Sequence, residues 1–352
     1  MHQAQRGENE SDSTVLYRLP GGDVCQKLTG RPLALARLGD IGDRGGFVFA
    51  PFDTSPDLPI LFFPGEAEPY APTARRPAPP AAAAALPLEE SSDYKADFQS
   101  MHRLLTGGDV RKVVLAHTYD IRADLRADDA LLFAEACRAY PEAFVSMVRT
   151  PHCGTWLTAS PEVLIEQSGG EMRTMALAGT MRAADGGSPA WDAKNVAEQG
   201  IVSQYIEDEL TPLAETLRKS GRKTVSSGDL LHLQTTFTFR PLRGVTLWDV
   251  ASRLHPTPAV CGMPQAAALA AIRRTEAVPR EYYSGFAGPV RPDGRASLFV
   301  NIRCMKMTAD RCRLYAGGGL MPDSDADDEE REIAAKADVM KRLAGCIATN
   351  RQ

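Results

Sequence analysis

The sequence contains no run of apolar residues approaching the roughly 20 that a membrane-spanning helix requires. It opens with MHQAQRGENE, a polar stretch of mixed charge that lacks the apolar core of a signal peptide. A net charge of -5 and a pI near 5.8 provide no excess of basic residues for binding nucleic acid. We therefore expect a cytoplasmic protein that binds neither a membrane nor a nucleic acid.

Cysteine is sparse and shows no ligand spacing. The seven cysteines are scattered, odd in number and contain no CxxC pair. This pattern indicates reduced thiols and excludes a disulfide framework or a zinc ribbon. The remaining composition, 43% hydrophobic and 24% charged, is that of an ordinary globular protein. A chain of 352 residues is long enough for one large domain or two medium ones.

The order of the predicted elements indicates an α+β protein. Residues 1–15 are expected to be a disordered tail, residues 16–352 one large domain, and the Pro/Ala-rich stretch 71–88 a surface loop. Short strands are expected over 16–70. Strands grouped by hairpins, with helices between them, predict antiparallel sheets with helices packed on their outside. The predicted helices are 94–106, 129–140, 192–220, 263–274 and 326–345; the predicted strands are 110–116, 143–149, 154–159, 163–167, 172–178, 231–238 and 297–307.

Lys112 is the most unusual residue of a predicted strand. In VRKVVLA at 110–116 it shares one face with Val110, Val114 and Ala116. Loss of hydration disfavours a charged ammonium, and this is how a lysine becomes a usable base near neutral pH. A lysine on an edge strand that extends its amine into solvent gives the same pattern. The pattern leaves both interpretations open.

Two predicted helices carry carboxylates at positions where apolar residues are expected. Glu198 extends the apolar face of the helix 192–220 by one turn, while Glu329, Glu332 and Lys336 lie at i, i+3 and i+7 of the last helix. Buried carboxylates need a cation or hydrogen-bond donors. The alternative is that these carboxylates are hydrated and interact with the N-terminal ends of the helix dipoles.

Two further features can bind an anion. Gly317, Gly318 and Gly319 leave a predicted strand and lead to the last helix, so their N–H groups can approach an anion, although such runs are also turns. Arg303 lies inside the apolar strand 297–307. Its guanidinium can clamp a carboxylate in bidentate fashion or form an internal salt bridge.

Nine segments surround these residues or follow them along the chain. They are RKVVLA at 111–116, ASPEVL at 159–164, ALAGTMR at 176–182, KNVAEQ at 194–199, LHPTPAVCGMP at 254–264, REYYSGFAG at 280–288, NIRCMK at 301–306, YAGGG at 315–319 and EEREIAAK at 329–336. Their order and form are typical of chorismate-binding enzymes, and the chain resembles the isochorismate synthases within that family. The resemblance extends from about residue 90 to the end of the sequence.

The resemblance implies the chorismate-utilising enzyme fold, with chorismate as substrate and Mg²⁺ as cofactor. A lysine at the position of Lys112 goes with water as the nucleophile, and the form of the segment around Thr257 is similar to that of isochorismate synthases. Anthranilate and aminodeoxychorismate synthases, which use ammonia, differ at Lys112. Lys112 would be the base, and Glu162 would be the acid that protonates the leaving C4 hydroxyl. Such an acid must be protonated beforehand, which requires a water-poor setting.

The resemblance also implies the remaining site residues. Mg²⁺ would be held by Glu198 and Glu332, with Glu329 direct or through water. Arg303 and the N–H groups of 317–319 would hold the pyruvyl carboxylate. His232, between two leucines, resembles the active-site histidine of the family, although a lone histidine there is also a common core residue. The other implied substrate-binding residues are Ala178, Gly179, Thr180, Thr257 and Lys336.

Three functions remain open after the sequence is read. The first is isochorismate synthase, acting as a monomer or weak homodimer in menaquinone or siderophore biosynthesis. The second is salicylate synthase, which adds pyruvate elimination. The third is a non-catalytic chorismate-binding or regulatory subunit, against which the presence of Lys112 and Glu162 counts. Gln199 and the pair Ala116-His117 depart from the family pattern beside functional positions.

Overall fold

The structure is a computed structural model that describes residues 13–72, 87–182 and 190–348. Within these residues the chain forms two ten-stranded sheets in which every pair of neighbouring strands is antiparallel. The first sheet has the order β16-β8-β20-β19-β10-β9-β1-β2-β6, with β7 also paired to β8. Its strands are β1 (Ser13–Arg18), β2 (Cys25–Gly30), β6 (Glu68–Tyr70), β7 (Glu89–Glu90), β8 (Lys112–Ile121), β9 (Phe144–Thr150), β10 (Gly154–Ser160), β16 (Gly262–Met263), β19 (Cys304–Met307) and β20 (Cys312–Leu320).

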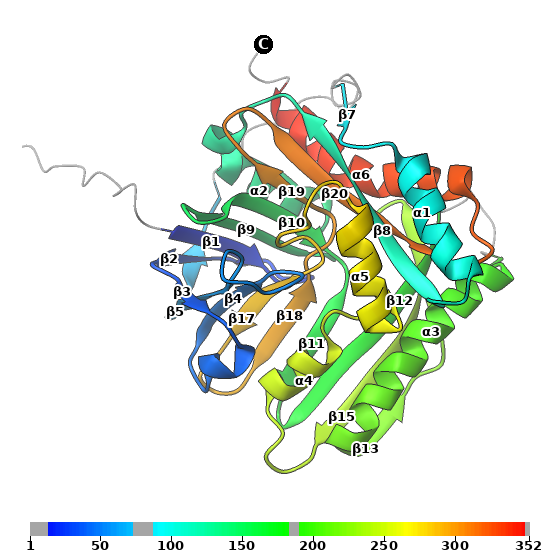
Figure 1. Cartoon of the computed structure of the whole chain (residues 1–352). Helices are drawn as coiled ribbons and strands as arrows, with labels where there is room; N and C mark the ends of the chain where they lie inside the picture. The colour runs from blue at the N-terminus through cyan, green and yellow to red at the C-terminus, as the bar shows by residue number, and fades with distance from the viewer. Residues whose placement is uncertain (1–12, 73–86, 183–189, 349–352) are drawn as a thin grey trace, which may run out of the picture.

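The second sheet has the order β13-β15-β12-β11-β18-β17-β4-β5-β3, and β14 also pairs with β15. Its strands are β3 (Leu33–Leu35), β4 (Gly46–Ala50), β5 (Ile60–Pro64), β11 (Val163–Ser168), β12 (Glu171–Arg182), β13 (Ala214–Lys219), β14 (Lys223–Ser227), β15 (Leu230–Pro241), β17 (Phe286–Val290) and β18 (Ala296–Val300). Both sheets therefore combine segments that lie far apart in the sequence (Figure 1).

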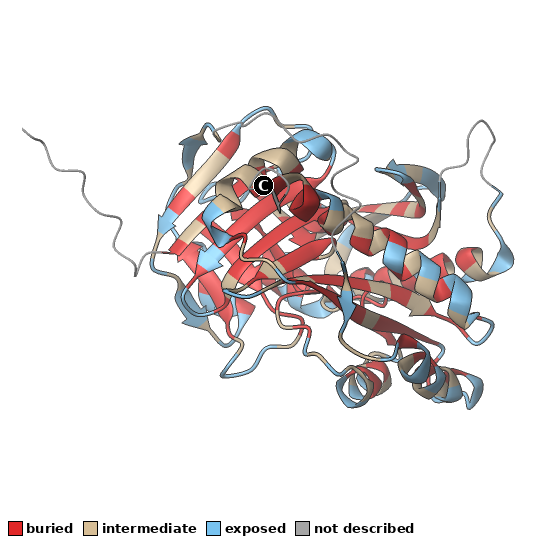
Figure 2. Cartoon of the chain, turned by 90° about the horizontal axis from the view of Figure 1, so that it is seen from above, coloured by how far each residue is buried: buried red, intermediate tan, exposed pale blue. Residues whose placement is uncertain are grey.

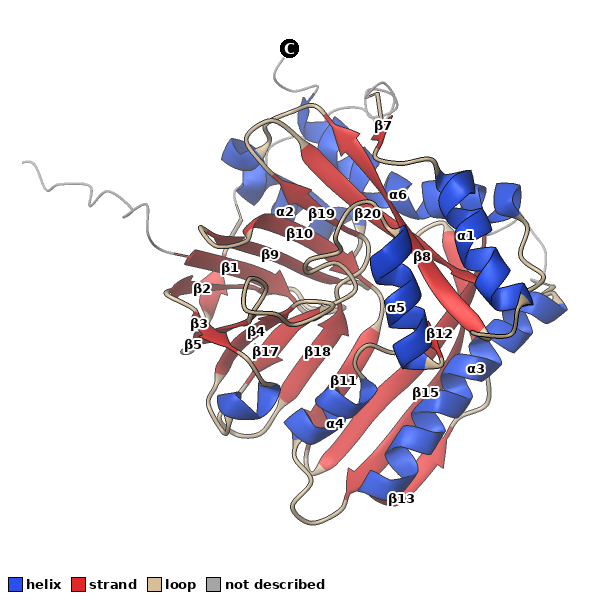
Figure 3. Cartoon of the chain, viewed as in Figure 1, coloured by secondary structure: helices blue, strands red, loops and turns tan. Residues whose placement is uncertain are grey.

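Helices cover the outer faces of the two sheets (Figure 3). On the first sheet lie α1 (Tyr94–Thr106), α2 (Asp129–Ala139), α5 (Gln265–Thr275) and α6 (Ala326–Ala348). On the second sheet lie α3 (Ala193–Leu210) and α4 (Leu247–Leu254). Short 3-10 turns occupy Leu38–Ile41, Arg126–Asp128 and Thr211–Leu213. None of the helices in the described ranges is long and apolar enough to cross a membrane.

The inner faces of the two sheets pack against each other through an aromatic-rich layer. Phe144 of β9 stacks on Phe299 of β18 with ring centroids 4.3 Å apart, and Phe49 of β4 contacts Trp156 of β10. Red buried segments fill the interior between the outer helices in Figure 2. The predicted α+β architecture, antiparallel sheets with helices outside, is confirmed.

Several predicted boundaries were wrong, and three of them matter for the description of the fold. The predicted helix 192–220 ends at Leu210 because Pro212 lacks the N–H that another helical turn needs, and 214–219 forms strand β13 instead. The predicted strand 297–307 is two strands in different sheets, β18 and β19, separated at 301–303. Strand β1 begins at Ser13, so the predicted tail 1–15 is too long; its first twelve residues, and residues 73–86 of the predicted loop, lie outside the described residues.

Candidate active site

A cavity that encloses about 630 Å³, including its open mouth, is lined by residues of both sheets and of α3 and α6. The predicted site residues that line it are Glu162, Ala178, Gly179, Thr180, Glu198, His232, Arg303, Gly317, Gly319 and Lys336. The fold therefore brings together residues that are spread over more than 170 positions of the sequence.

Lys112 is the first residue of β8 and is completely buried. Its Nζ lies 3.0 Å from Oε1 of Glu198 on α3, across the space between the first sheet and that helix. The alternative that its amine extends into solvent is therefore wrong. Val114, which shares its strand face, lines the cavity as the alternation predicts. A Cβ at Gly319 would lie 2.0 Å from Oε1 of Glu198, so this ion pair requires a glycine there.

Glu162 follows Pro161 between β10 and β11, and it is buried at the cavity wall. Its backbone N–H donates to Oγ of Ser160, and its carbonyl accepts from the N–H of Val300 at 2.9 Å, which fixes the turn. Burial raises the pKa of its carboxyl to about 8, although the nearby charges of Lys112 and other cations oppose the shift. The group is therefore mostly protonated at neutral pH and can donate a proton.

Arg303 and His232 form a buried pair that lines the same cavity. The Nδ1 of His232 lies 3.1 Å from the carbonyl of Gly179, and only a protonated Nδ1 can donate to it. The unprotonated Nε2 then accepts from Nη2 of Arg303 at 2.9 Å. Burial, Arg303 and Lys336 lower the pKa of His232 to about 3, so the ring is neutral and orients the guanidinium.

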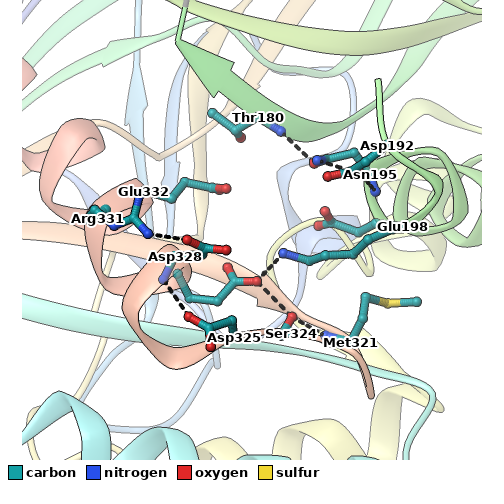
Figure 4. Close-up of polar contacts among 12 residues, drawn as sticks. Thr180, Asp192, Asn195, Glu198, Met321, Ser324, Asp325, Asp328, Arg331 and Glu332 are labelled. Carbon is teal, nitrogen blue, oxygen red and sulfur yellow. Dashed lines mark hydrogen bonds and ion pairs between the residues drawn. The ribbon is translucent and has the colours of Figure 1, made fainter. Parts of the chain in front are cut away.

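Each of the three predicted metal ligands is paired with a lysine. Glu329 of α6 is buried, forms an ion pair with Lys194 of α3, and accepts from Oγ of Ser324 at 2.7 Å. Ser324 is labelled in Figure 4, together with the other two predicted ligands, Glu198 and Glu332. Burial raises its pKa, and the charge of Glu332 adds to the shift. Glu332 pairs with Lys336 at 2.6 Å. The third carboxylate, on α3, is the partner of Lys112 described above.

The fit of these carboxylates to a magnesium ion follows from their chemistry. Across residues 13–72, 87–182 and 190–348, no three acidic, histidine or cysteine side chains converge as a metal cluster. Nevertheless, carboxylate oxygens are the protein ligands that Mg²⁺ prefers, and one or two of them suffice when water and substrate supply the rest. The repulsion between Glu329 and Glu332 is one that a divalent cation would relieve. The side chains present are therefore of the chemical type that binds this ion.

The glycines 317–319 lie inside strand β20 rather than in a turn. Gly317 is opposite Ala116 of β8. The N–H of Ala116 does not bond Gly317 but donates to Oε1 of Glu276 at 2.9 Å, so this is a non-hydrogen-bonded pair of the two strands. Because hydrogen-bonded and non-hydrogen-bonded pairs alternate, Gly317 and Gly319 point their backbone polar groups away from β8, whereas Gly318 points toward it. The prediction that all three N–H groups can approach an anion is therefore wrong for Gly318.

The bulge at Gly179 positions the adjoining cavity wall. The register of β12 with β15 shifts between Ala178 and Thr180, and Gly179 has a φ of 75°, which favours glycine. Oδ1 of Asn195 accepts from the N–H of Thr180 at 3.1 Å, so the first turn of α3 holds this bulge. Thr257 is buried behind the cavity wall and does not line it.

Lys194, Ser324, Tyr283 and Tyr315 belong to the site or its immediate support but were not predicted. The two tyrosines line the cavity. A signal for Lys194 was present, because it lies one helical turn before Glu198 and therefore on the same helix face.

The two departures from the family pattern point away from the cavity. Nε2 of Gln199 donates to Oγ1 of Thr235 at 2.9 Å in the second sheet. His117 is buried and makes edge contacts with Tyr94 and Tyr119. Neither side chain lines the cavity, so both departures change packing rather than the site.

Comparisons with known proteins show which family the chain belongs to. A family profile described as chorismate binding enzyme matches residues 69–345. A Mycobacterium tuberculosis protein assigned as the isochorismate synthase MenF is 34% identical over 275 residues, covering 72% of this chain and 73% of the relative. The isochorismate synthase EntC of Escherichia coli is 30% identical over 245 residues, covering 67% of this chain and 63% of the relative. The chain belongs to the chorismate-binding enzymes.

Solved structures show the same fold. The menaquinone-specific isochorismate synthase MenF of Escherichia coli aligns with a TM-score of 0.76 at 22% identity, covering 96% of this chain and 90% of that structure. Anthranilate synthase component I of Streptococcus pneumoniae aligns with a TM-score of 0.70 at 16% identity, covering 97% and 94%. Because enzymes with different names share this fold, the fold alone does not select the reaction, and the side chains of the site must do so.

Proposed function

We propose that this chain is an isochorismate synthase, which adds water at C2 of chorismate and expels the C4 hydroxyl. The observation that carries the proposal is a protonated carboxyl at the cavity wall together with a buried lysine, Lys112, whose ion-pair partner Glu198 lines the same cavity. Glu162 lines the cavity and has a pKa of about 8, and the charge of Lys112 acts on it. The reaction needs a base for the attacking water and an acid for the leaving hydroxyl.

The proposed roles of the two groups follow from their settings. Lys112, once its ammonium has released a proton to solvent, would take the proton of the water that attacks C2. Glu162 would give its proton to the C4 hydroxyl, which leaves as water while the ring double bonds shift. The proton gained by Lys112 and the proton lost by Glu162 balance, and both groups return to their starting states by exchange with solvent.

The remaining residues would hold the substrate and the metal. Glu198 and Glu332, with Glu329 direct or through water, would hold Mg²⁺, which when bound neutralises the ring carboxylate of chorismate. Arg303, kept in place by neutral His232, would hold the pyruvyl carboxylate with the outward N–H groups of 317 and 319. The bulge at 178–180 and Lys336 would line the space beside the ring.

The product would feed menaquinone or siderophore biosynthesis. The names of the relatives reported above support this proposal, because they include a menaquinone-specific enzyme. The site chemistry is the same for both routes.

Product analysis tests the proposal. Purified protein is incubated with chorismate in ¹⁸O-labelled water, with Mg²⁺ or with EDTA, and the products are separated by chromatography and mass spectrometry. We expect isochorismate that carries one ¹⁸O atom, and no turnover in EDTA. Salicylate with pyruvate would replace the proposal with a salicylate synthase. Absence of turnover with water or ammonia, together with chorismate binding, would indicate a non-catalytic subunit.

A further inference from the structure

A gap in the hydrogen bonding of β8 lies beside the candidate site. Strand β16 pairs with Lys112 and Val113, and β7 pairs only with Tyr119 and Asp120. Between them, among the described residues, no strand pairs with this edge of β8. The backbone groups of this stretch that point outward therefore need other partners, because an unpaired buried N–H or C=O costs free energy.

Backbone groups of Cys261 and Ser91 bond the N–H of Val114 and the carbonyl of Thr118, and Arg280 and Glu276 supply two further partners between these positions. Nη2 of Arg280 donates to the carbonyl of Val114 at 2.9 Å, and Oε1 of Glu276 accepts from the N–H of Ala116 at 2.9 Å. Nε of Arg280 donates to Oε2 of Glu276 at 2.8 Å, so the two side chains form one unit. Both side chains are almost completely buried. We call this unit the β8 edge clamp.

The β8 edge clamp also contacts the neighbouring walls of the cavity. Nη1 of Arg280 donates to the carbonyl of Val260 at 2.6 Å, and its guanidinium lies 5.9 Å from the ring centroid of Tyr283. Val114, Val260 and Tyr283 all line the cavity, whereas Arg280 and Glu276 do not. One buried guanidinium therefore connects three separate parts of the cavity wall from behind. Burial acts to lower the pKa of Arg280, but the charge and the hydrogen bond of Glu276 act together against it, and the pKa is raised.

We propose that Arg280 and Glu276 are positioning residues for the reaction: they fix the edge of β8 and thereby the placement of Lys112 and the substrate cavity. Lys112 lies two residues before Val114 on the same strand face, so a displacement of Val114 moves the base directly. The inference rests on the proposed function for the identity of the base. A misplacement of about 1 Å can cost about 100-fold in rate without contact to the substrate.

The test compares Arg280→Lys and Glu276→Gln with Arg273→Lys as a matched control. A lysine keeps the charge of Arg280 but cannot donate to Val114, Val260 and Glu276 at once. Arg273 lies in the last turn of α5, just before Glu276, and bonds Asp53, but this pair is exposed and does not line the cavity. Two quantities are measured: amide hydrogen exchange of peptides covering 112–118, and kcat and KM for chorismate per folded molecule.

We expect exchange at 112–118 to increase about tenfold in Arg280→Lys and less in Glu276→Gln, with no change in the control. We expect kcat to fall about 100-fold while KM changes little. A lower melting temperature with unchanged kcat per folded molecule would show a purely structural role and overturn the inference; so would unchanged exchange at 112–118. If Arg280→Lys does not fold, Glu276→Gln decides by the same two readouts.

Failure of the proposed function is distinguishable from failure of this inference. If the wild-type protein forms no isochorismate, the function is wrong, and chorismate affinity measured by calorimetry replaces kcat as the second readout. Weaker affinity together with faster exchange in the clamp variants, and not in Arg273→Lys, then supports the positioning role. Unchanged affinity rejects it.

Discussion

Replacing Glu162 by glutamine should stabilise the protein while it removes the activity. The carboxyl has a pKa of about 8 in the folded chain against an ordinary 4.5. Between these values the folded state keeps a proton that the unfolded state releases, so the stability of the wild type falls as pH rises through this window. A neutral glutamine of similar shape removes this dependence. One pKa unit corresponds to about 1.4 kcal/mol, so the variant should be more stable by about 3 kcal/mol at pH 7.

The assay is urea unfolding followed by tryptophan fluorescence and circular dichroism at pH 5, 6, 7 and 8. The difference in unfolding free energy between Glu162→Gln and the wild type should be about 1 kcal/mol at pH 5, grow by about 1.3 kcal/mol per pH unit up to pH 7, and begin to level off at pH 8. Glu166→Gln is the matched control, because Glu166 lies on the adjoining strand β11 in an exposed pair with Arg173. A difference independent of pH would refute the raised pKa, and near-wild-type turnover by Glu162→Gln would refute its role as the acid.

Three other substitutions test the remaining parts of the site. Lys112→Gln should fold, because glutamine has a similar volume, and should lose about 1,000-fold or more in turnover, because it removes the base. Turnover is measured by chromatography of isochorismate, and a near-wild-type value would show that the base is another group. Arg303→Lys should raise KM for chorismate about tenfold or more, because a single ammonium cannot bond His232 and a carboxylate as a planar fork does; an unchanged KM in steady-state kinetics contradicts this anchor. Gly319→Ala should lower both melting temperature and turnover, because its Cβ would lie 2.0 Å from Oε1 of Glu198; calorimetry showing unchanged stability would contradict the close packing.

The sequence predicts well those features that depend on local physics. Helix α1 begins and ends as predicted, because Oδ1 of Asp93 accepts from the N–H groups of Lys95 and Ala96 and Gly107 follows its last residue. The alternation along β8 correctly placed Lys112 and Val114 on one face, because side chains in a strand point to opposite sides in turn. Such features need no knowledge of distant residues.

The ion pairs of the site could not be predicted in the same way. Lys194 and Glu329 are separated by 135 positions, and Arg303 and His232 by 71. Each pair exists because the two sheets and their outer helices meet at one cavity, and local periodicity carries no information about that meeting. The resemblance to a family identified these site residues because the members of a family keep the residues that meet in the folded protein. The periodicity of a single sequence contains no such information.

The wrong prediction at 297–307 shows why Arg303 reaches the cavity. The apolar run reads as one strand, yet the chain leaves the second sheet after Val300 and enters the first at Cys304. Asn301 fixes this crossing: it is fully buried, its Nδ2 donates to the carbonyl of Tyr282 at 2.7 Å, and its Oδ1 accepts from Thr158. Arg303 has a φ of 50°, a conformation that a non-glycine residue adopts at a cost. In a continuous strand Arg303 would stay in one sheet, and its guanidinium would point to one of the two faces of that sheet. The break turns it instead into the space between the sheets, where His232 holds it, so the local strain is the structural condition for an arginine at the cavity.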